Sequence, residues 1–230
     1  MQHPPDETRH HFSETLDATL RATVELGALV LENVRRTTEA LLENRLDVAR
    51  QVIEADEEVD RKYATLEHRV FEVMARQQPV AGDLRFLVSL TRILYEIERS
   101  GDLAVNCAKG LIRREGYSLS TNVQGLIARM SRKAAELFGQ GLEALADLDA
   151  AAGARLDAAD DAVDELVGEL YTAIAERSDD MGFDLAIELS RVGRYMERIA
   201  DHAVNIAEHV TFIVTGSFPE DETAATRDEG

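Results

Sequence analysis

Apolar residues recur every three or four positions along almost the whole chain, which is the spacing of an amphipathic helix. Near the start, Leu16, Leu20 and Val24 share one helical face, and further on Val59 and Leu66 do the same. Polar and charged residues fill the positions between them. The pattern predicts an all-α protein.

Breaks in this pattern divide the chain into six segments. Pro79 and Gly82 interrupt it in the first half, and Gly116 ends the third segment, because proline and glycine both terminate helices. The second half repeats the plan, with its own break at residues 178–182. The predicted helices cover residues 8–43, 46–77, 83–114, 119–149, 152–177 and 183–214.

Six helices in two groups of three predict two tandem three-helix bundles related by an internal repeat. The first repeat spans residues 8–115 and the second spans residues 118–215. A helix of thirty residues is about 45 Å long, so the bundles should be elongated. The polar, acidic residues 216–230 predict a disordered tail.

The composition agrees with this helical prediction. Apolar residues make up 45% of the 230 positions, which is enough to build a sizeable core. Aromatic residues make up only 5% and there are four prolines, so turn formers and strand formers are scarce.

Charge and cysteine content narrow the partners and the compartment. Lys and Arg total 25 against 44 Asp and Glu, and the net charge of −19 disfavours nucleic acid and anionic lipid as partners. No apolar stretch approaches the ~20 residues that a membrane span needs. The single cysteine, Cys107, fits a reducing compartment, and residues 1–11 lack the apolar core of a signal peptide. We therefore expect a cytoplasmic protein.

A repeated acidic motif is the most informative feature of the sequence. Residues 98–106 read ERSGDLAVN and residues 197–205 read ERIADHAVN. Each copy has two carboxylates four positions apart, which places them on one face of a helix. Upstream of each copy lies a second such pair. The four pairs are Asp56 with Asp60, Glu98 with Asp102, Asp160 with Asp164, and Glu197 with Asp201.

The spacing of these pairs predicts that they meet in space. In an antiparallel helical hairpin, residues equally distant from the turn lie at the same height. The midpoint between the two pairs of the first half falls at Pro79, and that of the second half falls near residue 180. Both midpoints coincide with predicted breaks. We therefore expect four carboxylates to gather in each half.

Such a gathering of like charges is unfavourable without a counter-charge, because each like-charged pair at this spacing costs a few tenths of a kcal/mol. A tighter cluster would raise carboxylate pKa values or bind a cation. Oxygen ligands suit Mg²⁺ or Mn²⁺, and iron and zinc are further candidates. The alternative is a solvated acidic face whose carboxylates pair with neighbouring arginines such as Arg61, Arg99 and Arg198.

Residues 78–85, 98–102 and 197–208 resemble the PhoU family of phosphate-signalling regulators. The resemblance extends over residues 10–215 and includes both repeats in order. It implies two three-helix bundles with multinuclear metal sites on the acidic motifs. It also implies negative regulation of the phosphate-starvation response, in which the protein couples the phosphate ABC transporter to a sensor histidine kinase.

The resemblance assigns ten residues to metal binding. In the first repeat they are Asp56, Asp60, Glu98, Asp102 and Asn106, and in the second they are Asp160, Asp164, Glu197, Asp201 and Asn205. Each asparagine would coordinate through its carbonyl or orient a water, and an ordinary polar surface position is the alternative. The first repeat has Leu103 and Lys109 where the second has His202 and Glu208, so we expect the first site to bind metal more weakly or with fewer ions. His202 lies one position off the carboxylate face and is not assigned as a ligand.

An enzymatic function is the alternative to a regulator. Helical bundles with carboxylate-bridged metals activate water or oxygen, and di-iron proteins do so with paired Glu-x-x-His motifs. Here that motif occurs only at residues 7–10, and neither a phosphate-binding loop nor a nucleophile triad is recognisable. We expect a non-enzyme, with metal storage or a di-metal enzyme as the alternative. Because elongated bundles with exposed apolar stripes often self-associate, we also expect a homodimer.

Overall fold

A computed structural model describes residues 5–177 and 181–218, without the side chains of residues 5–9 and 11. Six long helices account for most of these residues, and no strand occurs in the described ranges. The helices are α1 (Pro5–Glu43), α2 (Leu46–Gln77), α3 (Ala81–Arg113), α4 (Thr121–Asp147), α5 (Ala152–Glu176) and α7 (Phe183–Thr215). The all-α prediction is confirmed, and most helix ends lie within two or three residues of their predicted positions.

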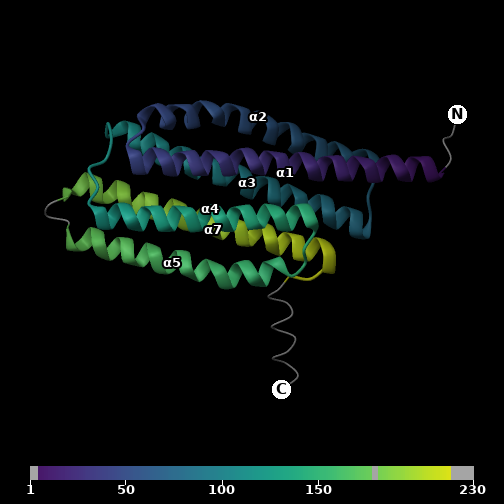
Figure 1. Ribbon diagram of the computed structural model, residues 1–230. Coiled ribbons are helices and arrows are strands. Elements are labelled where there is room, and N and C mark those ends of the chain that lie inside the picture. The colour runs from purple at the N-terminus through teal and green to yellow at the C-terminus, as the bar shows by residue number, and fades with distance from the viewer. Residues whose placement is uncertain (1–4, 178–180, 219–230) are drawn as a thin grey trace, which may run out of the picture.

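The helices form two three-helix bundles, as the sequence predicts. Helices α1, α2 and α3 pack against one another, and so do α4, α5 and α7. Figure 1 shows the helices lying roughly along one direction, with the first bundle above the second. The bundles meet along two seams, where α3 packs against α7 and α1 packs against α4.

One hydrophobic core runs through both bundles. On the α3 side of the seam, Leu94 and Ile97 are fully buried, and on α7 so are Ile199, Ala203 and Ile206. These residues belong to a single buried cluster to which all six helices contribute. The two repeats therefore share apolar burial instead of each closing a core of its own.

The turn between α2 and α3 falls where the midpoint argument predicts. Gln78 ends α2 in the left-handed conformation, with φ 47°, and Val80 precedes α3 with an extended backbone. Pro79 lies between them and cannot continue the helix. The second turn lies between α5 and α7, and residues 178–180 within it are outside the described residues.

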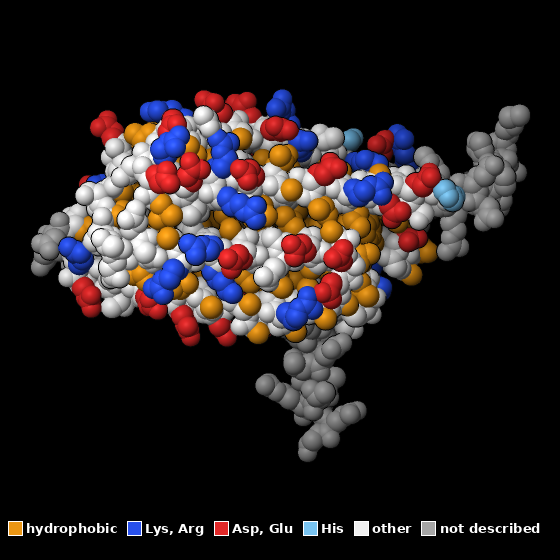
Figure 2. All heavy atoms as spheres, viewed as in Figure 1, with side chains coloured by type: hydrophobic (Ala, Val, Ile, Leu, Met, Phe, Trp, Pro, Cys, Tyr) orange, Lys and Arg blue, Asp and Glu red, His pale blue; other side chains and the backbone are white. Residues whose placement is uncertain are grey.

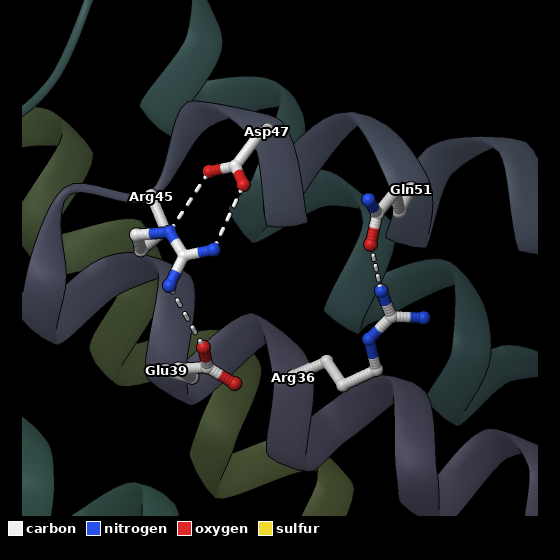
Figure 3. Close-up of polar contacts among 5 residues, drawn as sticks. All are labelled: Arg36, Glu39, Arg45, Asp47 and Gln51. Carbon is white, nitrogen blue, oxygen red and sulfur yellow. Dashed lines mark hydrogen bonds and ion pairs between the residues drawn. The ribbon is translucent and has the colours of Figure 1, made fainter.

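Polar contacts fix the corner between α1 and α2 (Figure 3). The Arg45 guanidinium donates two hydrogen bonds, of 2.9 and 2.8 Å, to the Asp47 carboxylate and lies 3.6 Å from Glu39. Arg36 of α1 donates to the Gln51 side chain of α2. The bond from Arg45 lowers the pKa of Asp47 to about 2. The charged side chains of Arg45, Glu39 and Asp47 are about half exposed to solvent, so they set the geometry of the corner more than its stability.

The end of α7 is anchored on the start of α3. Arg85 of α3 donates a 3.1 Å hydrogen bond to the Ile213 carbonyl and lies over the Phe212 ring. Phe218 folds back to stack on Phe212, with ring centroids 4.4 Å apart. Residues 216–218, which the sequence assigns to the tail, therefore lie against α7, and the remainder of that tail is outside the described residues.

The helix surfaces are mixed in character. Figure 2 shows charged and apolar side chains interspersed over the face that it presents. Within the described residues, no helix combines the length and the apolar character needed to cross a bilayer. Exposed apolar side chains gather on the α2–α3 hairpin, where Phe71, Leu84, Val88 and Tyr95 are among them.

Close packing of α4 on α7 depends on Gly141. A Cβ atom at this position would lie 3.0 Å from the Ala203 carbonyl oxygen, a backbone atom that cannot easily move. Overpacking of this kind costs about 1–3 kcal/mol. At Gly125 of the same helix, a Cβ atom would meet nothing within 4 Å, and Gly→Ala gains about 1 kcal/mol from helix propensity.

We therefore expect Gly141→Ala to be less stable than Gly125→Ala by about 1–3 kcal/mol. Urea denaturation of the two variants and the parent chain measures the difference. Equal stability of the two variants would show that the α4–α7 contact is looser than the structure indicates.

Candidate metal centre

The four carboxylates of the first repeat lie close enough to repel one another. Asp56 and Asp60 project from α2, and Glu98 and Asp102 project from α3. Burial, followed by repulsion from Asp60 and Asp102, raises the pKa of Asp56 to about 6. Burial also raises the pKa of Glu98, and all three of the other carboxylates add to that increase. The hairpin thus brings the two pairs together, as their spacing predicts.

The second repeat builds a matching cluster between α5 and α7. Burial raises the pKa of Asp160 to about 6, and Asp201 and Asp164 are the next largest causes. The Asp160 Oδ1 atom is buried and has no hydrogen-bond partner among the described residues. Burial likewise raises the pKa of Glu197, and Asp164 and Asp201 contribute to the increase. Asp160 thus corresponds to Asp56 in position and in electrostatic environment.

Basic side chains compensate only part of this charge. Arg99 pairs with Asp102 at 2.9 Å in the first cluster, and Arg194 pairs with Glu197 in the second. Lys109 lowers the pKa of Asp56, and the second repeat has Glu208 at that position. The alternative of a solvated acidic face paired with arginines is therefore realised in part, with one direct ion pair to an arginine for each cluster among the residues that the structure describes.

The donor chemistry of both clusters fits a hard cation, since it consists of carboxylate oxygens, one of them buried and unpaired at Asp160. No three carboxylate, imidazole or thiol groups in the described part of the chain come close enough together to enclose an ion. In each cluster, the two carboxylate pairs project from two neighbouring helices. Their side chains would therefore have to rotate to complete a coordination sphere around an ion.

The two asparagines of the motif lie in different surroundings. Asn106 is exposed on α3, one turn beyond Asp102. Asn205 is half-buried on α7 and donates a hydrogen bond to Glu96 of α3. The amide of Asn205 therefore contributes to the seam between the bundles, and sequence reasoning did not assign that role to it.

A buried polar contact at this seam is a further feature that the sequence did not predict. The Ser100 hydroxyl donates to the Glu96 carbonyl at 2.8 Å and lies 3.0 Å from His202 Nδ1. On the other side of the ring, His202 Nε2 lies 3.6 Å from the Glu96 carboxylate, so the imidazole lies between two polar groups of α3. Burial, with Arg198 and Arg99, lowers the pKa of His202 to about 4, so the ring is neutral at pH 7. The available signal was a histidine one position off the carboxylate face, on the apolar side of α7.

The raised pKa values predict how stability depends on pH without metal. Folding raises the pKa of Asp56 and Asp160 from 3.8 to about 6, so the folded state binds protons more tightly. Their contribution to stability therefore increases as the pH falls from about 6 to about 4. His202 has a lowered pKa in the folded state and acts in the opposite direction over a similar range.

A double variant separates these contributions. We expect the variant with Asp56→Asn and Asp160→Asn to be more stable than the parent chain at pH 7 in EDTA, and the difference to shrink as the pH falls to 4. Thermal unfolding at a series of pH values measures it. A difference that is constant with pH would contradict the assigned pKa values.

Comparison with known proteins identifies the family. The PhoU domain model matches residues 23–111 and 127–210, one match in each bundle. A phosphate-specific transport system accessory protein, PhoU homolog 1 of Mycobacterium leprae, is 37% identical over 94% of this chain and 97% of its own. A PhoU homolog of Synechocystis is 34% identical over 90% of this chain and 93% of its own. The crystal structure of PhoU from Pseudomonas aeruginosa superposes with a TM-score of 0.83, at 26% identity, over 90% of this chain and 100% of that chain. The chain belongs to the PhoU family.

Proposed function

We propose that this protein is an accessory regulator of phosphate uptake that represses the phosphate-starvation response. The observation that carries the proposal is the family match over both bundles, together with relatives named as accessory proteins of phosphate-specific transport. Two repeats of similar sequence and electrostatics indicate that both bundles serve one kind of interaction.

The proposed partners are the phosphate ABC transporter and a sensor histidine kinase at the cytoplasmic face of the membrane. The regulator would bind both partners and keep the kinase inactive when phosphate is plentiful. Its net charge of −19 favours basic partner surfaces over nucleic acid. The exposed apolar side chains of the α2–α3 hairpin, including Phe71 and Tyr95, supply contact area for a partner or for a second copy in a homodimer.

We further propose that the two carboxylate clusters bind divalent or trivalent metal ions. The first repeat would use Asp56, Asp60, Glu98 and Asp102, with Asn106 beside them, and the second would use Asp160, Asp164, Glu197 and Asp201, with Asn205 nearby. A bound cation would cancel carboxylate repulsion and offer coordination positions to oxygen ligands of a partner. The unpaired Oδ1 atom of Asp160 supports this assignment.

A non-enzymatic role fits the relatives, which are named as accessory proteins. The second candidate is carboxylate-bridged metal storage or a di-metal enzyme, and the acidic clusters are the observation in its favour. The Glu-x-x-His motif that such enzymes use occurs here only at residues 7–10, and Glu7 lies outside the described side chains.

A reporter of the phosphate-starvation response tests the proposal. In phosphate-rich cells that lack this protein, we expect reporter activity to rise to the level of starved cells and to fall again when the protein is restored. A reporter that stays low after deletion would reject the regulatory role and favour metal storage as the function.

Complementation by variants tests whether the regulator needs metal. The chain with Asp102→Asn and Asp201→Asn is expected to fail to repress. A control with Glu143→Gln and Asp147→Asn loses two charges at an acidic surface of α4 that belongs to neither cluster, and should still repress. If both variants repress equally, the protein works as a metal-independent scaffold.

A further inference from the structure

The second seam between the bundles, where α1 packs against α4, contains a groove of about 330 Å³. Arg35 and Thr38 of α1 line one side, and Ser131, Arg132 and Glu136 of α4 line the other. This volume is at the lower end of the range for small-ligand sites, which is roughly 300–1,000 Å³. The groove belongs to neither carboxylate cluster, because those clusters lie between α2 and α3 and between α5 and α7.

A buried hydroxyl in this groove has no partner. Ser131 is fully buried, and its Oγ atom makes no hydrogen bond among the described residues. Serine in a helix can satisfy its hydroxyl by donating to the carbonyl four residues back, as Ser100 and Ser190 do here. An unsatisfied buried polar group requires an explanation, and a ligand absent from the structure is one.

The groove is also locally basic in a strongly acidic protein. Arg35 and Arg132 are exposed, and neither has an ion-pair or hydrogen-bond partner within the described residues. By contrast, Arg129 on the same helix pairs with Glu169 at 2.9 Å. Glu136 supplies the only carboxylate lining the groove, so its lining side chains carry one net positive charge. Figure 2 shows Lys and Arg side chains gathered to the left of centre, over the face that α1, α4 and α5 form.

The geometry points to a binding site for a small phosphate-type oxyanion, either free phosphate or a phosphomonoester, in the α1–α4 groove. Two guanidinium groups on opposite walls match the several acceptor oxygens of such an anion. The Ser131 Oγ atom is enclosed in the free protein, so its side chain would have to rotate to donate a further hydrogen bond to the anion. This inference does not rest on the proposed regulatory role, and it needs no metal.

Calorimetric titration of the metal-free chain in EDTA, at constant ionic strength, tests the site. Inorganic phosphate and phenyl phosphate are the probes, and EDTA prevents phosphate from binding through a metal on the carboxylate clusters. We expect saturable binding of at least one probe at one site per chain. Binding of phosphate alone identifies the free ion as the ligand, and binding of phenyl phosphate alone identifies a phosphomonoester.

Variants along the groove distinguish this site from general attraction of anions. Arg35→Gln and Arg132→Gln should each weaken binding by about tenfold, because each removes a charge-assisted hydrogen bond. Arg129→Gln makes the same charge change on the same helix and should leave binding unchanged. Glu136→Gln removes a repelling charge and should tighten binding by up to about fivefold.

Ser131→Ala supplies a test that is independent of charge. It should weaken binding by about two- to tenfold without lowering the melting temperature, because the hydroxyl has no partner in the free protein. Two outcomes would overturn the inference. They are failure of both probes to bind, and equal losses of binding in Arg129→Gln and Arg132→Gln.

Discussion

Adding Mn²⁺ at about one hundred times its dissociation constant is expected to stabilise the folded chain by about 2.7 kcal/mol for each independent site. For a protein of this size, that corresponds to a rise of about 5–11 °C in melting temperature. The physical reason is that the cation removes repulsion among carboxylates that folding brings together, and the unfolded chain lacks this arrangement. Differential scanning calorimetry with Mg²⁺, Mn²⁺, Fe²⁺ and Zn²⁺ measures the effect and ranks the metals.

Paired variants assign the effect to the clusters. Asp160→Asn with Asp201→Asn should remove the contribution of the second cluster, and Asp56→Asn with Asp102→Asn should remove that of the first. We expect the larger loss from Asp160→Asn with Asp201→Asn, because Lys109 already attracts Asp56 in the first cluster. The control with Glu143→Gln and Asp147→Asn should keep the full rise.

The effect should also depend on pH. Cation binding requires ionised carboxylates, and the pKa values of Asp56 and Asp160 are raised to about 6. Stabilisation by metal should therefore diminish as the pH falls through about 6. No rise in melting temperature with any of these metals, or an equal loss in the control, would reject the metal assignment.

Replacing Phe138 by alanine is expected to destabilise the whole protein by about 3–5 kcal/mol. Phe138 lies on α4, and 0% of its surface is accessible to solvent. It belongs to the buried cluster that both bundles share. The loss should therefore appear in one cooperative transition, and amide hydrogens of α3 in the first bundle should lose protection along with those of α4.

Calorimetry and hydrogen exchange measure this prediction together. Phe183→Ala, at a position that is 78% exposed on α7, makes the same chemical change and should alter stability by no more than about 0.5 kcal/mol. Two separate unfolding transitions, with only the second bundle affected, would show that the repeats fold independently despite their common core.

The two carboxylate clusters could be predicted from the sequence as far as their geometry follows from helix periodicity. Carboxylates four residues apart share a helix face, and Pro79 marks the turn that brings Asp56 and Asp102 to the same height. The partners of individual side chains could not be predicted in this way. Asn205 continues the motif of Asp201, yet it donates across the seam to Glu96 on the other bundle.

The α1–α4 groove likewise could not be predicted from the sequence. In the sequence, Ser131 is an ordinary helical serine next to Arg132, and nothing marks Arg35 as its neighbour. These residues meet because α1 packs against α4, about one hundred positions away along the chain. Such long-range packing has no periodic signal.

By itself, the sequence determined the helices, their grouping in threes and the pairing of carboxylates within each hairpin, because a 3.6-residue period and a tight turn fix these features locally. Only the tertiary structure decided how the two bundles join. Packing of α3 on α7 buries His202 against Ser100 and merges the two cores, and packing of α1 on α4 opens the basic groove. The physical reason is that packing between helices depends on side chains from distant segments filling one another's gaps, and that fit is a property of the folded chain as a whole.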